Sequence, residues 1–180
     1  MEIIETVIKD LLIIKPKVFE DARGYFFESY NEGVFKKNGI DVNFMQDNQS
    51  LSNANVLRGL HFQAPPFAQG KLVRVIKGAV LDVAVDIRKK SPTYGKNVTI
   101  ELTEENKTMF YIPPGFAHGF LTLRDHTIFS YKCTELYNKE SEGAVLWNDK
   151  DLDIHWNIIN PILSEKDLSG TPFKEFVSPF

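Results

Sequence analysis

The sequence predicts an all-β protein built as a β-sandwich or β-barrel. From residue 71 to residue 134, short runs rich in β-branched side chains follow one another, separated by turn signals at intervals of about ten residues. Phenylalanine is frequent, with 14 in 180 residues, and aromatic side chains make up 12% of the chain. Because aromatic and β-branched side chains pack well on a pleated sheet, this composition favours strands over a helical bundle.

The strands from residue 71 onward can be placed by pattern alone. Residues 71–77 form a β-branched run that stops at Gly78, and residues 80–88 alternate, with Asp82 and Asp86 on one face and Val83 and Val85 on the other. Further strands are expected at 97–102, 108–112, 119–123 and 127–134. Such a series predicts a closed or two-layered β architecture with only short peripheral helices.

The two ends of the chain give weaker patterns. Residues 1–20 and 25–30 predict short strands, separated by a turn at 21–24. Asn31 is expected to cap a short helix that ends at Gly39, and a second short helix is expected near residues 164–168. Since no repeat and no Gly/Ser-rich linker divides the chain, we expect one domain over residues 1–180.

Composition excludes several classes of protein. Lys plus Arg number 21 and Asp plus Glu 24, and this balance does not predict binding to nucleic acid or to an anionic membrane. The single cysteine, Cys133, cannot form an intrachain disulfide, which is typical of a reducing compartment. The N-terminus is acidic where a signal peptide would be basic, and the apolar runs are too short to span a bilayer. We therefore expect a cytoplasmic protein.

Two of the four histidines, His61 and His118, lie in glycine-containing motifs that allow tight backbone geometry, whereas His126 and His155 are interpreted as structural. The spacing from Pro113 to His118 is similar to the second metal motif of cupin barrels. A cupin metal site also needs a His-x-His pair, and here Gln63 stands in place of the second histidine. We expect a cupin-like jelly-roll barrel that holds no metal.

Basic and tyrosine side chains near these histidines suggest an anionic ligand. Arg58 and Lys71 are candidates for gripping phosphate or stabilising an oxyanion, whereas Arg74 is interpreted as an ordinary strand charge. No glycine-rich phosphate loop is present, so side chains would have to hold any phosphate. Tyr131 and Tyr137 are six residues apart and would share one face of an unbroken strand, where a tyrosine can donate a proton or stack on a base.

The whole set of motifs resembles the dTDP-4-dehydrorhamnose 3,5-epimerase family. The resemblance covers nearly the whole chain and rests on many segments in order: 21–26, 46–50, 58–63, 69–75, 82–88, 91–95, 112–120, 147–149 and 163–167. It implies a homodimeric cupin-like enzyme that needs no cofactor and no metal. The implied reaction converts dTDP-4-dehydro-6-deoxy-D-glucose to dTDP-4-dehydro-L-rhamnose, on the route to dTDP-L-rhamnose and polysaccharides such as O-antigen.

The resemblance also implies a role for individual residues. It implies that His61 abstracts a proton, that Asp167 orients His61, that Tyr131 donates a proton and that Lys71 stabilises the enolate. The substrate-binding positions that it implies are Arg23, Glu28, Gln46, Asn48, Arg58, Lys71, His118, Tyr137, Glu142 and Lys166, with Tyr137 stacked on thymine. In this family the strand that corresponds to residues 23–28 is exchanged between subunits.

These residue types fit the chemistry of epimerisation. Carbons 3 and 5 flank the ketone at carbon 4, which acidifies their protons, and inversion needs a base and an acid on opposite faces of the ring. Three alternatives remain on the same scaffold: an epimerase of carbon 3 only, a sugar-nucleotide 3,4-ketoisomerase and a metal-dependent cupin enzyme. A non-catalytic sugar-nucleotide binding module is the alternative from another class.

Overall fold

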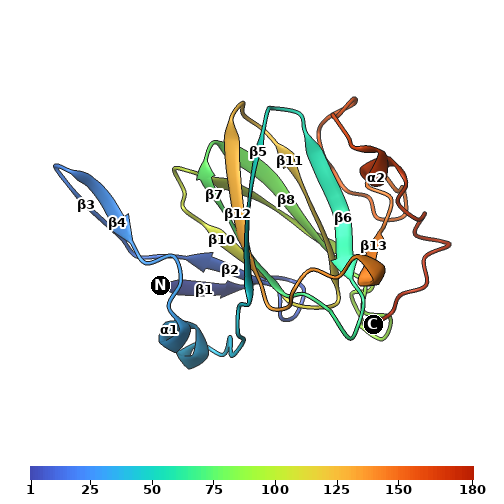
Figure 1. Ribbon diagram of the computed structural model, residues 1–180, viewed down its shortest axis with the longest axis horizontal. Coiled ribbons are helices and arrows are strands. Elements are labelled where there is room, and N and C mark those ends of the chain that lie inside the picture. Colours follow the sequence, from blue (N-terminus) through green and yellow to red (C-terminus); the bar gives the residue numbers. More distant parts are fainter.

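Two antiparallel β-sheets packed face to face form the body of the protein in the computed structural model, which describes residues 1–180 (Figure 1). The six-stranded sheet has, in spatial order, β1 (Glu2–Glu5), β2 (Leu12–Lys15), β10 (Met109–Ile112), β7 (Lys71–Lys77), β12 (Thr127–Cys133) and β5 (Gln46–Ser52). The five-stranded sheet has β13 (Glu142–Ala144), β6 (Leu57–Gln63), β11 (Phe116–Thr122), β8 (Ala79–Asp86) and β9 (Asn97–Thr103).

Smaller elements surround this sandwich. They are the two-stranded hairpin of β3 (Val18–Asp21) and β4 (Gly24–Phe27), and the short helices α1 (Glu32–Lys37), η1 (Lys139–Ser141) and α2 (Glu165–Leu168). The side chain of Asn31 caps α1 as predicted, by accepting a hydrogen bond from the Val34 N–H. None of the helices is long and apolar enough to cross a membrane.

The all-β prediction is confirmed, and from residue 71 the predicted strands match β7 to β12 within a few residues. The largest difference in this region is at β11, which begins at Phe116 rather than at residue 119. Three further strands, β5, β6 and β13, were not predicted, because their sequences are polar or glycine-containing and lack a β-branched run. Of these, β5 and β6 are the strands that carry Asn48, Arg58 and His61.

Three apolar clusters stabilise the sandwich. The first fills the space between the sheets and includes Val73, Phe110 and Phe129 from one sheet and Phe120 from the other. The second lies on the outer face of the five-stranded sheet, under the C-terminal segment that Figure 1 shows beside β6 and β13. The third lies where Phe35 of α1 packs on the outer face of the six-stranded sheet. Both sheets are therefore covered on their outer faces as well as joined through their inner faces.

Strand β8 keeps the predicted alternation, and its polar face points into the sandwich. Val80 and Ala84 belong to the cluster between the sheets, whereas Val83 and Val85 pack beneath the C-terminal segment. Asp82 and Asp86 share the inner face and are completely buried. Buried carboxylates need hydrogen-bond or charge partners, so each of the two has a dedicated set of them.

The partners of Asp86 are near the end of β8. Its carboxylate accepts hydrogen bonds from the Arg88 guanidinium at 2.8 and 2.9 Å, from the Ser91 hydroxyl at 2.6 Å and from the Thr93 hydroxyl at 2.7 Å. Burial alone would raise the pKa of this carboxyl, but these hydrogen bonds outweigh it and lower the pKa to about 2. The ionised carboxylate thus fixes the turn that joins β8 to β9.

Replacement of Asp86 by asparagine tests this network. Because the folded-state pKa lies below the unfolded value, the carboxylate stabilises the fold above about pH 4, and this contribution is lost as pH falls toward 2. At pH 7 we expect Asp86→Asn to lower the free energy of unfolding by on the order of 2 kcal/mol. Thermal unfolding between pH 2 and pH 7 should show the difference from the unsubstituted protein shrinking with acidification. Asp153→Asn, at an exposed carboxylate, is the control.

Candidate active site

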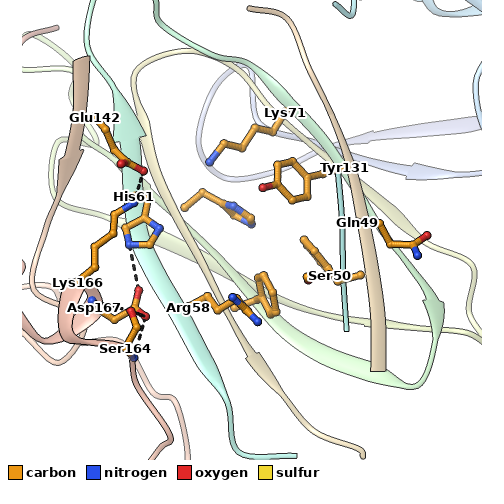
Figure 2. A pocket seen from close by; sticks show the side chains of 13 residues that line it. Gln49, Ser50, Arg58, His61, Lys71, Tyr131, Glu142, Ser164, Lys166 and Asp167 are labelled. Atoms are coloured by element: carbon orange, nitrogen blue, oxygen red, sulfur yellow. Dashed lines mark hydrogen bonds and ion pairs between the residues drawn. The ribbon is translucent and has the colours of Figure 1, made fainter. Parts of the chain in front are cut away.

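A polar cavity of about 310 Å³ lies between the inner faces of the two sheets (Figure 2). Its lining consists of Gln49, Ser50, Arg58, His61, Lys71, His118, Phe120, Phe129, Tyr131, Glu142, Ser164, Lys166 and Asp167. A second cavity of about 330 Å³ adjoins it, because His61, Lys71, Tyr131 and Glu142 line both. The second cavity extends the site toward Gln46, Asn48, Gln63, Gln69 and Tyr137.

His61 and Asp167 lie together on one side of the first cavity. His61 is on the inner face of β6, and its Nε2 atom lies 3.0 Å from Oδ1 of Asp167 on α2. The two atoms are in close contact, although the N–H direction is not aligned for a hydrogen bond. Since Nε2 faces a carboxylate, Nδ1 is the nitrogen left to act as a base.

The carboxylate of Asp167 is held by the chain on every side. Its Oδ1 accepts a hydrogen bond from the Gly59 N–H at 2.9 Å, and its Oδ2 accepts from the Ser164 hydroxyl at 2.5 Å and the Ser164 N–H at 3.2 Å. Burial alone would raise the pKa of Asp167, but His61, Ser164 and Gly59 outweigh it and hold the pKa well below its usual range. Asp167 is therefore ionised and oriented beside His61 at any pH near neutrality.

A second histidine–aspartate pair lies deeper. Nε2 of His118 on β11 lies 3.0 Å from both carboxylate oxygens of Asp82 on β8, and both side chains are buried. Burial lowers the pKa of His118, while the nearby Asp82 carboxylate opposes that shift. His118 also stands opposite His61 in the register of β11 and β6. The two imidazoles thus belong to one wall of the cavity.

Lys71 and Tyr131 occupy the other wall, across the cavity from His61 (Figure 2). Both point inward from the six-stranded sheet, Lys71 from β7 and Tyr131 from β12. Each carboxylate at the cavity has a partner, since Asp167 faces His61, Asp82 faces His118 and Glu142 binds Lys166, and Lys71 pairs with none of these carboxylates. Burial lowers the pKa of Lys71 and raises that of Tyr131, so the phenol stays protonated at neutral pH.

Glu142 lies at the boundary between the first and the second cavity. Its carboxylate accepts hydrogen bonds from the ammonium of Lys166 and from the hydroxyl of Tyr137, the latter at 3.1 Å. Burial alone would raise the pKa of Glu142, but these two partners lower it below its usual value. Arg58 adds a further positive charge beside the cavity, where its guanidinium donates to the Ser52 hydroxyl at 3.2 and 3.3 Å.

The structure gathers most, but not all, of the residues implied by the resemblance. His61, Lys71, Tyr131 and Asp167 share the first cavity with Arg58, His118, Glu142 and Lys166, and Gln46, Asn48 and Tyr137 line the second. Arg23 and Glu28 do not reach either cavity of their own chain. Arg23 lies on the turn of the hairpin, 90% exposed and paired with Asp21 at 2.6 Å, and Glu28 is exposed beyond β4 and accepts a hydrogen bond from Asn31.

The expectation that Tyr131 and Tyr137 share one strand is wrong. Strand β12 ends at Cys133, and Tyr137 lies in the loop between β12 and η1. The chain turns away after Thr134, whose hydroxyl and N–H both bond to Gly70 rather than to a strand. The two tyrosines thus share only the second cavity, because Tyr131 lines both cavities and Tyr137 lines the second alone.

Two residues that complete the histidine–aspartate pairs were missed by the sequence analysis. Asp82 was placed on a strand face without a function, because only the fold shows that it meets His118. Ser164 stands three residues before Asp167 and forms a capping box with it, a pattern that the sequence does contain. No three His, Cys, Asp or Glu side chains gather in a group that could hold a metal ion.

Comparison with known proteins decides the family. The sequence profile described as dTDP-4-dehydrorhamnose 3,5-epimerase matches residues 5–175. A relative of that name from Shigella flexneri is 53% identical over 174 residues, which are 96% of each chain. The chain belongs to the dTDP-4-dehydrorhamnose 3,5-epimerase family.

Solved structures of the family agree with this assignment. The crystal structure of the Elizabethkingia anophelis epimerase superposes with a TM-score of 0.92 at 52% identity and covers 97% of both chains. A Legionella pneumophila dTDP-6-deoxy-D-glucose-3,5-epimerase, solved in complex with dTDP-4-keto-L-rhamnose, has a TM-score of 0.92 at 46% identity and covers 96% of this chain and 93% of its own. The sandwich is therefore the cupin-like fold of this family, as the sequence predicted.

Gly59 provides a test of how β6 and β11 position the two histidines. Its φ is +122°, and a Cβ atom there would lie 2.5 Å from the Gly119 Cα and 2.7 Å from the His118 carbonyl oxygen. We expect Gly59→Ala to destabilise the fold by several kcal/mol and to abolish activity, because backbone cannot move aside as a side chain can. Thermal unfolding would measure the loss.

The matched control is Gly39→Ala, at another positive φ of +86° that has open space around it. This substitution should cost only the strain of the backbone conformation, about 1 kcal/mol. Equal losses for the two variants would contradict the close-approach explanation.

Proposed function

We propose that the chain epimerises dTDP-4-dehydro-6-deoxy-D-glucose at carbons 3 and 5 to give dTDP-4-dehydro-L-rhamnose, in the synthesis of dTDP-L-rhamnose. Membership of the family over residues 5–175 supports the substrate and the reaction. The observation that carries the proposal in the structure is the His61–Asp167 pair, which faces Tyr131 and Lys71 across one cavity. In the proposed reaction, His61 serves as the base and Tyr131 as the acid, on opposite sides of a bound ring.

Proton removal is assigned to His61. Its Nδ1 takes the proton from the carbon beside the ketone, and the electron pair of the broken C–H bond becomes an enolate with its charge on the carbonyl oxygen. The imidazolium that forms is stabilised by the ionised Asp167 carboxylate, which lies 3.0 Å from Nε2. Asp167 itself keeps its charge, because four contacts hold its pKa low.

Lys71 is assigned to the enolate oxygen. It points into the cavity without a carboxylate partner, so its ammonium is free to approach the negative charge that develops on the substrate. Such a charge contact stabilises the transition state more than the neutral ketone, because it strengthens as the oxygen becomes an anion. The reaction proposed here draws on these side chains and on the acidity that the ketone provides, without a cofactor.

Tyr131 is assigned as the proton donor. The protonated phenol lies across the cavity from His61 and transfers its proton to the carbanion carbon on the opposite face, so the new C–H bond has inverted configuration. The tyrosinate then regains a proton from water and the imidazolium of His61 loses one. Hydrogen from the solvent therefore enters the product at each inverted carbon.

Binding of the nucleotide is assigned to seven of the polar residues around the two cavities. Arg58 and Lys166 supply positive charge for the diphosphate, and Tyr137, a residue that is 55% exposed, offers a ring face for the thymine. The remaining positions proposed to bind substrate are Gln46, Asn48, His118 and Glu142, all of which line the cavities.

We further propose that the chain works as a homodimer with strand exchange. In Figure 1 the β3–β4 hairpin extends away from the sandwich, and it exposes the aromatic side chains of Phe19, Tyr25 and Phe26. An exposed apolar patch of this kind is typical of an interface. Packed on a second copy, the hairpin would bring Arg23 and Glu28 to the partner's cavity, which explains why they do not reach their own.

Residues 1–180 are proposed to act as one catalytic domain in the cytoplasm. The first cavity draws its residues from both sheets and from the C-terminal helix α2, so the site needs segments from most of the chain. The unpaired, buried thiol of Cys133 supports a reducing compartment.

Proton NMR in deuterated water tests the reaction and the residue roles together. With dTDP-4-dehydro-6-deoxy-D-glucose, we expect deuterium at carbons 3 and 5 and formation of the L-sugar. His61→Asn should lower turnover by about 10²–10⁴-fold, because the base is lost, while the Kd for dTDP stays within a few-fold. Tyr131→Phe should keep deuterium exchange better than it keeps inversion, because proton abstraction precedes the step that needs the phenol.

Other results would redirect the assignment. Deuterium and inversion at carbon 3 alone would make the protein a 3-epimerase. Absence of exchange at either carbon, from folded protein that binds dTDP, would favour a ketoisomerase or a binding module. Activity of His61→Asn within a few-fold of the unsubstituted enzyme would show that His61 is not the base.

The exchanged strand can be tested by mixing two inactive variants. We expect sedimentation equilibrium to give twice the chain mass of 20.6 kDa. When Arg23→Ala and His61→Asn chains are co-expressed, each mixed dimer has one site with neither substitution, so roughly one quarter of the activity should return. If activity does not return in mixed dimers, Arg23 serves the cavity of its own chain.

A further inference from the structure

The loop that carries Tyr137 is held almost entirely by side chains. Residues 134–138 connect β12 to η1 without belonging to a strand or helix. The hydrogen bonds made by the peptide groups of residues 135–137 all run to side chains rather than to other peptide groups. A loop without such supports would be mobile, since it has no backbone ladder to hold it.

Three glutamines from three different places supply three of these four bonds, and the fourth is donated by the Leu136 N–H to the side chain of Glu135. The side-chain amide of Gln69 donates to the Glu135 carbonyl at 2.8 Å, and that of Gln63 donates to the Leu136 carbonyl at 3.1 Å. The side-chain oxygen of Gln46 accepts from the Tyr137 N–H at 2.8 Å. Gln46 belongs to the six-stranded sheet, Gln63 to the five-stranded sheet, and Gln69 lies two residues before the start of β7. The loop is thus fixed to both layers of the sandwich.

Gln63 makes the largest contribution. Only 5% of this residue is exposed, and besides Leu136 its amide donates to the Phe67 carbonyl at 2.7 Å while its oxygen accepts from the Asn138 N–H at 2.8 Å. Only a side chain with both a donor and an acceptor at its end can make these three bonds together. Gln63 also lies two residues after His61 on β6, so the two side chains share the inner face of one strand.

We propose that Gln46, Gln63 and Gln69 form a glutamine clamp that positions Tyr137 for stacking on the nucleotide base, with Gln63 and Gln69 acting only through the loop. This inference rests on the proposed function, in which Tyr137 receives thymine. Gln63 occupies the place where a metal-binding cupin would have its second histidine. In this chain Gln63, at that position, holds the loop whose Tyr137 receives the nucleotide base.

The clamp has two physical consequences. It fixes the backbone of residues 135–138 before the ligand arrives, so binding does not have to meet the entropic cost of ordering the loop. It also fixes the loop relative to His61, because Gln63 and His61 belong to the same strand. The distance between the base-binding surface and the reacting carbons is thereby set in the free enzyme.

Glutamine-to-methionine variants test the clamp, since methionine has a similar length but makes no such hydrogen bonds. We expect Gln63→Met to raise the Kd for dTDP and the KM for the sugar nucleotide by about tenfold, and Gln69→Met by a few-fold, in keeping with three lost bonds against one. The kcat should stay within about threefold, because neither residue touches the reacting carbons. Because Gln69 is only half-buried, we expect Gln69→Met to fold. Its dTDP binding can therefore be measured even if Gln63→Met does not fold.

Combination with Tyr137→Ala separates a positioning role from general destabilisation. If the clamp acts through Tyr137, then adding Gln63→Met or Gln69→Met to Tyr137→Ala should weaken dTDP binding no further. Asn106→Leu is the matched control, because the Asn106 amide also makes three bonds to a turn, with Glu101, Thr103 and Thr108, at a place remote from the cavities. It should lower the melting temperature and leave the Kd for dTDP unchanged.

The outcomes distinguish this proposal from the one on which it rests. Unchanged dTDP binding by Tyr137→Ala would remove the stacking role itself. Weaker binding by Tyr137→Ala, with normal binding by both glutamine variants, would overturn the clamp and leave the stacking role in place. Additive losses in the double variants would also overturn it, because the glutamines would then act on the nucleotide by another route.

Discussion

The buried carboxylate of Asp167 joins two parts of the chain that lie 108 residues apart, and the site depends on that junction. One of its oxygens accepts a hydrogen bond from the Gly59 N–H and faces His61, while the other is held by Ser164. The same group thus docks α2 on β6, keeps its negative charge and sets the orientation of the imidazole. Helix α2 has only four residues and therefore little stability of its own. The capping box between Ser164 and Asp167 both begins this helix and holds the Asp167 carboxylate in place.

Around this junction the two sheets supply different chemical groups. The five-stranded sheet carries the histidines, each beside a carboxylate, whereas the six-stranded sheet carries Lys71 and Tyr131. Because the sheets pack face to face, their inward side chains meet across a cavity and can address opposite faces of one bound ring. The second cavity continues toward Tyr137, so the two cavities form one elongated site that extends from His61 to Tyr137.

The sequence allowed strands β7 to β12 to be predicted. It did not allow prediction of β5 and β6, the two strands that matter most for the site. Runs of β-branched residues and alternating apolar residues located β7 to β12, because burial of at least one strand face leaves a clear apolar pattern. Strands β5 and β6 lack that pattern, since they line a polar cavity and carry side chains such as Asn48, Arg58 and His61. The position of Tyr137 could not be predicted from a local pattern either. Its loop is held by hydrogen bonds with glutamine amides instead of by turn residues.

By itself, the sequence determined the all-β class, the strand series and, through its motifs, the family and its reaction. The tertiary structure alone decided which side chains meet: that Asp82 serves His118, that Ser164 and Gly59 hold Asp167, and that Arg23 stays away from its own cavity. The physical reason is that strand pattern depends on neighbours in the chain, whereas a buried charge is stabilised by whatever partner the fold brings within hydrogen-bond distance.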